Sequence, residues 1–145
     1  MYIITATRFH DISCGHRVVN HESKCAHLHG HNYRIHFTVL AENPSAPLDT
    51  LGRVIDFDVI KIKLCEWLER VWDHRFLVFT EDPLKTVLVQ TDPAGVVVVH
   101  FNPTAENMAA HLLNIVGPEQ LKDTGVRLIE VTVEETRKCN ATARL

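Results

Sequence analysis

The chain lacks several features that would assign it to a common functional class. It has no basic run and carries a formal net charge of −3, so nucleic acid is not expected as its main partner. No apolar stretch approaches the roughly 20 residues that a membrane-spanning helix needs. The N-terminus has no basic segment followed by an apolar one, as a secretory signal would. We therefore expect neither a nucleic-acid nor a membrane partner.

Closely spaced cysteine pairs are also missing. The four cysteines, Cys14, Cys25, Cys65 and Cys139, lie far apart and form no C-x-x-C motif. This pattern favours independent thiols in a reducing cytoplasm over a disulfide framework. There are no internal repeats or low-complexity segments, and 46% of the 145 residues are hydrophobic. We expect residues 1–145 to form a single domain that buries a core without disulfides.

The residue type in excess is histidine. There are ten, and half of them fall between His16 and His31. His29 and His31, separated by one glycine, would share a face of a strand, and His16 would join them from an earlier strand-like segment. Three imidazoles match catalytic zinc sites with an open fourth position, although incidental histidines are the alternative. His27 precedes the strand, and we expect it to be a bystander.

Hydrophobic periodicity predicts an α+β fold. A helix is expected from about Asp58, and a second from Asn102–Asn107, with Pro103 in its first turn, to about Val116 before Gly117-Pro118. Residues 80–95 read as a loop with a short strand or helical turn. The expected strands cover residues 2–19, 29–41, 96–101 and 126–136. This order predicts an antiparallel sheet with two helices on one face, whose exposed edges oligomerisation would cover.

Three further residues suggest proton chemistry. Cys25 could be a buried small hydrophobe, or a thiolate base whose pKa falls beside a zinc–histidine cluster. Asp73 and His74 stand where the first helix should end. They could form a proton relay, in which the carboxylate orients the imidazole, or they could be a helix end with a surface histidine.

Acidic and hydroxyl side chains near two element ends suggest ligand contacts. Alternation in the last strand places Glu135 on one face with Ile129, Val131 and Val133. A carboxylate there must be paired or bind a ligand such as the guanidine-like edge of a heterocycle, unless it reaches solvent at the strand end. Thr104 and Glu106 could serve the start of the second helix, contact a ligand, or do both.

Six ordered motifs resemble the 6-pyruvoyltetrahydropterin synthase family, collinearly from about residue 3 to residue 136. They are Gly15-His16-Arg17, Cys25-x-x-x-His29-Gly-His31-Asn-Tyr33, Val54-Ile-Asp56-Phe57, Leu68-x4-Asp73-His74-x-x-Leu77, Asn102-Pro-Thr104-Ala-Glu106-Asn107 and Val133-x-Glu135-Thr136. The resemblance implies the tunnelling fold, in which trimers form a β-barrel and two trimers stack into a homohexamer. It also implies active sites at the subunit interfaces.

The same resemblance implies a small-molecule pterin substrate, 7,8-dihydroneopterin triphosphate, and Zn²⁺ as the only cofactor. It assigns one group of residues to zinc, one to proton transfer and one to the pterin pocket. In that order they are His16, His29 and His31; Cys25, Asp73 and His74; and Thr104, Glu106 and Glu135.

The spacing between Cys25 and His29 is similar to that of the bacterial branch of this family. That branch makes 6-carboxy-5,6,7,8-tetrahydropterin for queuosine and related deazapurines, and releases acetaldehyde and triphosphate. Two alternatives stay open: a 6-pyruvoyltetrahydropterin synthase in biopterin or folate-type metabolism, and a pterin- or zinc-binding protein without turnover.

Overall fold

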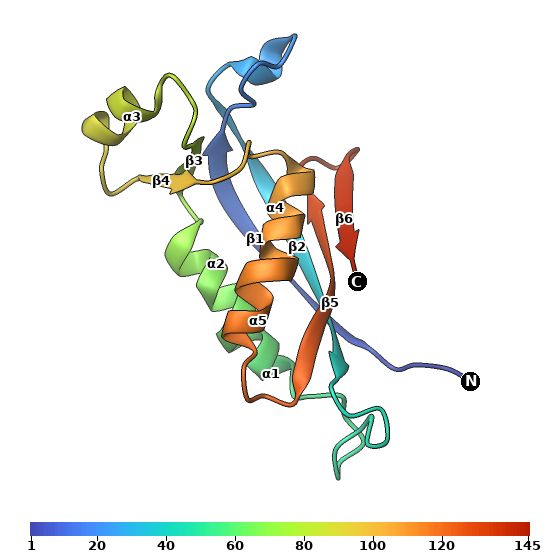
Figure 1. The fold of residues 1–145 in the computed structure, drawn as a ribbon. Coiled ribbons are helices and arrows are strands. Elements are labelled where there is room, and N and C mark those ends of the chain that lie inside the picture. The colour runs from blue at the N-terminus through green and yellow to red at the C-terminus, as the bar shows by residue number, and fades with distance from the viewer.

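A computed structural model describes residues 1–145 as one curled sheet with helices on one face (Figure 1). The sheet has six strands in the order β4-β3-β1-β2-β5-β6. Their bounds are β1 Ala6–His16, β2 His29–Ala41, β3 Arg75–Phe79, β4 Val96–Val99, β5 Val126–Glu134 and β6 Asn140–Arg144. The α+β class is therefore confirmed.

The long strands form an antiparallel core, as the sequence predicts. β1 pairs with β2 along its whole length, from Ala6 opposite Val39 to His16 opposite His29. β5 pairs antiparallel with β2 and β6 with β5. The expectation of a purely antiparallel sheet is wrong at one side, where β3 pairs parallel with β1 and β4 parallel with β3. Helical crossovers separate these strands, and crossovers permit parallel pairing.

Two helical segments cover one face of the sheet. The first runs through α1 (Phe57–Ile60), a π-helical turn at residues 61–65 and α2 (Glu66–Val71); the second through α4 (Ala105–His111), a π-helical turn at residues 112–116 and α5 (Gly117–Gln120). The short α3 (Lys85–Thr91) lies between β3 and β4.

The second helical segment differs from its predicted bounds at both ends. It does not stop at Gly117-Pro118, because Gly117 has a helical backbone and Pro118 sits in the first turn of α5, where a missing N–H is tolerated. At the start, Thr104 is the N-cap, so Pro103 precedes the helix instead of lying in its first turn.

The last long strand contains a β-bulge that breaks the predicted alternation. Glu130 pairs with Thr38 and Leu128 with Val39, which leaves Ile129 without a partner. Leu128 is consequently buried, and Ile129 does not continue the inner face as expected. Val131 and Val133, beyond the bulge, are fully buried, so the predicted parity leading to Glu135 survives.

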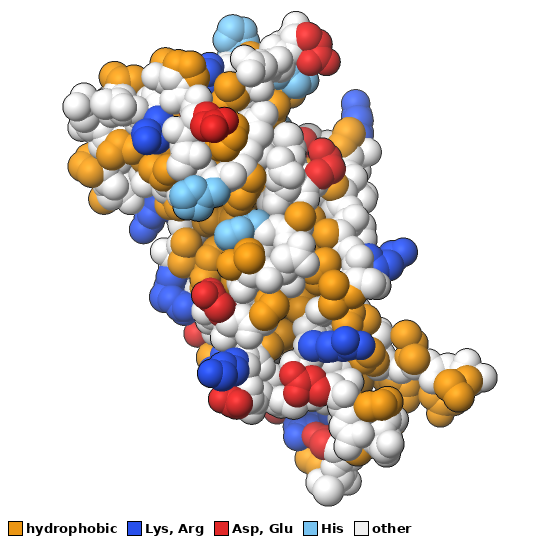
Figure 2. All heavy atoms as spheres, viewed as in Figure 1, with side chains coloured by type: hydrophobic (Ala, Val, Ile, Leu, Met, Phe, Trp, Pro, Cys, Tyr) orange, Lys and Arg blue, Asp and Glu red, His pale blue; other side chains and the backbone are white.

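The core lies between the sheet and the two helical segments. Tyr33, Ile35, Phe37 and Val39 of β2 are fully buried there. At the other extreme, the N-terminal residues Met1–Ile3 extend away from the sheet and expose their apolar side chains (Figures 1 and 2). None of the helices combines the length and apolar character required to cross a bilayer.

Packing of the first helical segment can be tested with a matched pair of truncations. Leu68 is fully buried in α2, so Leu68→Ala should lower the free energy of unfolding by about 2–5 kcal/mol. Ile62 lies on the same helical segment and is 52% exposed, so Ile62→Ala should cost about 0.5 kcal/mol or less. Urea denaturation at one protein concentration would measure both, and equal costs would contradict the packing described.

Candidate metal centre and active site

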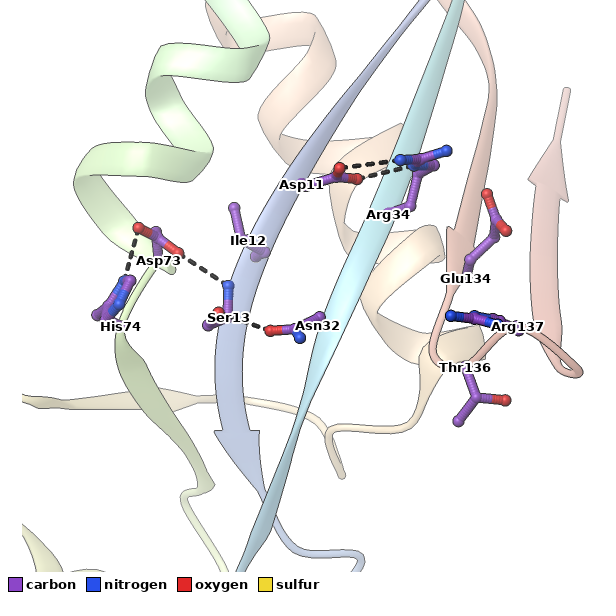
Figure 3. Close-up of a pocket in the computed structure, with 10 residues that line it drawn as sticks. All are labelled: Asp11, Ile12, Ser13, Asn32, Arg34, Asp73, His74, Glu134, Thr136 and Arg137. Atoms are coloured by element: carbon purple, nitrogen blue, oxygen red, sulfur yellow. Dashed lines mark hydrogen bonds and ion pairs between the residues drawn. The ribbon is translucent and has the colours of Figure 1, made fainter.

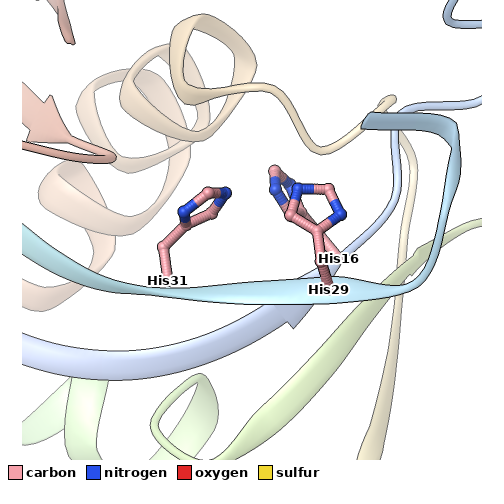
Figure 4. Close-up of side chains that lie close together, drawn as sticks. All are labelled: His16, His29 and His31. Atoms are coloured by element: carbon pink, nitrogen blue, oxygen red, sulfur yellow. The ribbon is translucent and has the colours of Figure 1, made fainter. Parts of the chain in front are cut away.

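The structure brings His16, His29 and His31 together at one end of the β1–β2 pair (Figure 4). His16 ends β1 opposite His29, and His31 follows on the same face of β2. One possible ligand atom from each residue lies within 4.8 Å of the other two. His16 is buried, and the other two are half-buried.

Hydrogen bonds fix the tautomers of two of these imidazoles. The Nδ1 atom of His16 lies 2.5 Å from the carbonyl oxygen of Pro103, and the Nδ1 atom of His29 lies 2.7 Å from that of His27. Because a carbonyl only accepts, each Nδ1 donates the hydrogen bond, and in the neutral ring the lone pair is then on Nε2. His27 therefore contributes its main chain to the centre, while its side chain is a bystander as predicted.

The third imidazole has an unused ring nitrogen. The Nε2 atom of His31 is buried and has no hydrogen-bond partner. Burial lowers the pKa of His31, with the charges of Glu135 acting in the opposite direction, so the ring is held neutral. Neutral imidazoles with free Nε2 atoms are the ligands that a borderline metal ion requires. The three residues therefore fit a metal ion.

Glu135, just beyond β5, adds a carboxylate to the same cluster. Its Oε1 atom lies 3.2 Å from Nε2 of His16 and 3.3 Å from Nε2 of His31. The close contact with His16 and the neighbouring imidazoles hold the pKa of Glu135 below its usual range, although burial acts against them. Glu135 thus provides a charged acceptor at the edge of the centre. The strand alternation had predicted an acidic side chain on this inward face.

Cys25 lies in the connection between β1 and β2, on a single 3₁₀ turn of residues 24–26. The N–H of Val18 donates to its carbonyl oxygen at 2.8 Å, and its side chain is half-buried. The main chain of Cys25 is therefore tied to the segment that follows His16 at the end of β1.

Tyr33 is a site residue to which the sequence reasoning gave no role. It is fully buried, and its hydroxyl oxygen lies 3.3 Å from both ring nitrogens of His16. Burial, and then the charges of Glu135 and two thiols, raise the pKa of Tyr33, so the phenol stays protonated. Strand parity was the available signal, since Tyr33 is the next inward residue after His29 and His31.

Asp73 and His74 form the expected pair, but the pair lies apart from the histidine cluster in the fold (Figure 3). The Asp73 carboxylate accepts from the N–H of Ser13 and from Nδ1 of His74, each at 2.8 Å. The His74 side chain is 76% exposed and lines a cleft of about 690 Å³ with Asn32 and Arg34, which alternate with the buried residues of β2. The pair therefore opens on the helix-free face, whereas the histidine cluster lies on the helix-covered one.

Thr104 and Glu106 make no hydrogen bond or ion pair with the cluster within one chain. The Thr104 hydroxyl accepts from the N–H of Asn107 at 3.1 Å, so it caps α4. Glu106 is exposed in the first turn of that helix. The capping interpretation is confirmed for Thr104, and a ligand role for both residues stays a prediction.

Two other thiols are buried and unreactive in character. Cys14 is the cross-strand partner of His31, and burial raises the pKa of its thiol to about 12. Burial also raises the pKa of Cys65 to about 11. Since the thiolate is the reactive form, neither residue is a candidate base near neutral pH.

Metal binding can be tested by comparing two substitutions. One removes the ring of a candidate ligand, and the other changes the side chain of the residue whose carbonyl orients that ring. His29→Ala should weaken divalent-metal binding by more than about 100-fold, because it removes one of three nitrogen donors. His27→Ala keeps the main-chain carbonyl, so affinity should stay within about threefold of the parent chain. Competition with a chromophoric chelator would measure both, and comparable losses would contradict the assignment of ligands.

Comparison with known proteins places this geometry in a family. The sequence model described as 6-pyruvoyl tetrahydropterin synthase matches residues 5–145. A 6-carboxy-5,6,7,8-tetrahydropterin synthase from Rickettsia typhi is 34% identical over 140 residues, covering 94% of this chain and 97% of the relative. A probable enzyme of the same name from Halobacterium salinarum is 36% identical over 126 residues, covering 86% of this chain and 76% of the relative.

Solved structures agree on the fold. An uncharacterized protein from Wolinella succinogenes has a TM-score of 0.83 at 24% identity and covers 99% of both chains. A 6-pyruvoyl tetrahydropterin synthase from Caenorhabditis elegans has a TM-score of 0.64 at 24% identity, covering 100% of this chain and 97% of that one. With a family match over nearly its whole length and a three-histidine centre at the end of its central hairpin, this chain belongs to the 6-pyruvoyl tetrahydropterin synthase family.

Proposed function

We propose that the chain is a 6-carboxy-5,6,7,8-tetrahydropterin synthase, which converts 7,8-dihydroneopterin triphosphate to that product with release of acetaldehyde and triphosphate. The observation that carries this proposal is the shared name of relatives at 30–34% identity over 94% of this chain. The short Cys25–His29 connection, which folds as a single 3₁₀ turn, is consistent with the same branch. We place this chemistry in the cytoplasm and in the pathway to queuosine.

We propose zinc as the metal of the histidine centre. Three imidazole nitrogens and one open position form the donor set typical of catalytic zinc. When bound, zinc supplies Lewis acidity that makes the side-chain hydroxyls of the substrate more acidic. His16, His29 and His31 would hold it, with the Pro103 and His27 carbonyls orienting two of the rings.

The protein groups around this centre suggest a division of labour. Cys25, on the turn beside the cluster, would remove a proton from the substrate side chain. The Glu135 carboxylate would accept N–H groups from the amino-pyrimidine edge of the pterin in a bidentate manner. Thr104 and Glu106 would line the pterin pocket. The redox change is internal to the substrate, so no organic cofactor is required.

The position of Asp73 and His74 supports a site shared between copies of the chain. Within one chain they open on the helix-free face of the sheet, whereas the histidine cluster lies on the helix-covered face. We therefore propose that the pair completes the site of a neighbouring copy and serves there as the proton relay. A homohexamer built from two trimers would provide such neighbours and would cover the free edges at β4 and β6.

Product analysis with 7,8-dihydroneopterin triphosphate tests the proposed reaction. Zinc-loaded protein should release acetaldehyde together with the carboxylated tetrahydropterin. Cys25→Ala should lower kcat by at least about 100-fold while the metal content is unchanged, because a base is lost and the ligands are kept.

Two results would redirect the proposal. A pyruvoyl product without acetaldehyde would move the chain to the biopterin-type alternative. Neither product, with zinc bound, would favour a pterin- or zinc-binding protein without turnover.

Complementation between inactive copies tests the shared site. If each site takes Cys25 from one copy and His74 from another, co-assembling equal amounts of Cys25→Ala and His74→Ala chains should restore about a quarter of the parent activity. The two variants assayed separately should stay inactive. A mixture that is as inactive as its components, although mixed oligomers form, would show that each copy uses its own Asp73–His74 pair.

A further inference from the structure

Arg17 and Asp82 form a partly buried ion pair whose role the proposed reaction leaves open. The Nε atom of Arg17 donates to Oδ2 of Asp82 at 2.7 Å, and the Asp82 side chain is 0% exposed. Asp82 and His16 are the two buried residues of polar or charged type in the whole chain. A fully buried carboxylate is costly unless its oxygens are satisfied, so the pair should have a specific structural consequence.

Asp82 itself is rigidly held. It lies in the corner between β3 and α3, where its N–H donates to the Phe79 carbonyl at 2.9 Å. Its second oxygen, Oδ1, accepts from the N–H of Leu84 at 2.8 Å. With both oxygens occupied and the main chain bonded, Asp82 provides a fixed point for the Arg17 guanidinium.

The other side of that guanidinium reaches the turn that carries Cys25. The Nη1 atom of Arg17 donates to the carbonyl oxygen of Ala26 at 3.1 Å. The neighbouring carbonyls are also held, Cys25 by the N–H of Val18 at 2.8 Å and His27 by Nδ1 of His29 at 2.7 Å. The carbonyls of three successive residues, 25–27, are therefore bonded either to the two residues that directly follow β1 or to the first residue of β2.

Of the three groups that bind these carbonyls, one is a main-chain N–H and one is the ring of a candidate metal ligand. The third, Arg17, is a side chain outside the set of ligands, so it can be substituted without removing a ligand. We propose that Arg17 and Asp82 are positioning residues, which set where the Cys25 thiol stands relative to the histidine cluster. Asp82 fixes the guanidinium, and the guanidinium holds Ala26 and so the turn. The catalytic consequence of this inference rests on the proposed function, whereas its structural consequence for the thiol does not.

Arg17→Lys should keep one contact of the guanidinium, the one with Asp82, and lose the other, the one with the Ala26 carbonyl. A lysine can keep a charge beside Asp82 but lacks the planar fork that also reaches Ala26. With metal-loaded, full-length protein we expect kcat to fall by about 10- to 100-fold, because small displacements of a reacting group are costly. KM should stay within about threefold and metal content unchanged, since neither the ligands nor Glu135 is altered.

Alkylation by iodoacetamide, resolved for each cysteine by peptide mass spectrometry, gives a readout independent of turnover. In Arg17→Lys the Cys25 rate should change by at least about threefold, because the turn is released. Cys14 and Cys65 are buried and should stay unmodified, which reports an intact fold. Asp82→Asn should reproduce both effects, because it removes the charge that anchors Arg17.

Asp49→Asn is the matched control. Asp49 also accepts from an arginine Nε, that of Arg53 at 2.8 Å, and from main-chain N–H groups, but it lies in the connection between β2 and α1. The kcat of the Asp49→Asn variant and the rate at which its Cys25 is alkylated should both stay within about twofold of the parent chain.

The inference is wrong if Arg17→Lys and Asp82→Asn both keep the parent kcat and Cys25 alkylation rate. It is also wrong if they expose Cys14 and Cys65, since the pair would then hold the whole fold and not the turn. Full turnover by Cys25→Ala would instead overturn the proposed catalytic role of the thiol. In that case a changed alkylation rate in Arg17→Lys would still support the positioning of Cys25 by the pair.

Discussion

The candidate site depends on the register between β1 and β2. His16 stands opposite His29 because the two strands pair along eleven residues without a shift. A slip by one residue would turn every side chain of one strand to the other face. Four fully buried residues of β2, Tyr33, Ile35, Phe37 and Val39, would then lose their burial, at a cost of about 1.5–3 kcal/mol each. The hydrophobic core thus enforces the arrangement of the histidines.

The same alternation divides the functional groups between the two faces of the sheet. Inward positions carry the histidines and Tyr33, and burial raises the pKa of Tyr33, which keeps its phenol protonated. Outward positions carry cross-strand polar pairs, such as Arg34 with Asp11 at 2.8 Å and His36 with Glu134. Asp73 joins the outward set by accepting from Ser13. A chain organised in this way presents two chemical surfaces, which the proposed assembly would combine.

The sequence predicted those parts of the fold that follow from strict alternation. The bounds of β2 agree with the structure, and the inward row of His29 and His31 follows from parity alone. The failures have local causes. The bulge at Ile129 interrupts a period of two, and residue spacing gives no sign of an unpaired residue. The helical Gly117 is equally hidden, because its small size accommodates Leu128 from β5, a contact between distant segments.

The site was predictable to a different degree. Histidine spacing and the parity of Glu135 were sufficient to gather one metal centre with one acid. No local pattern could have shown that Asp73 and His74 open on the opposite face, because the turn after α2 and its bond to Ser13 decide that. The Arg17–Asp82 pair was equally out of reach, since its two residues are separated by 65 positions and meet only through the parallel strands β1 and β3.

Main-chain carbonyls provide the orienting contacts for two of the three candidate ligands. Pro103 and His27 lie in irregular segments, yet each presents a carbonyl to an imidazole Nδ1 atom. Pro103 precedes the capped start of α4, and the His27 carbonyl ends a turn whose other carbonyls are also bonded. Because a carbonyl survives any side-chain substitution, the tautomers depend on the backbone path and not on the identity of residues 27 and 103. The geometry of the centre is therefore coupled to the capping of α4 on one side and to the Cys25 turn on the other.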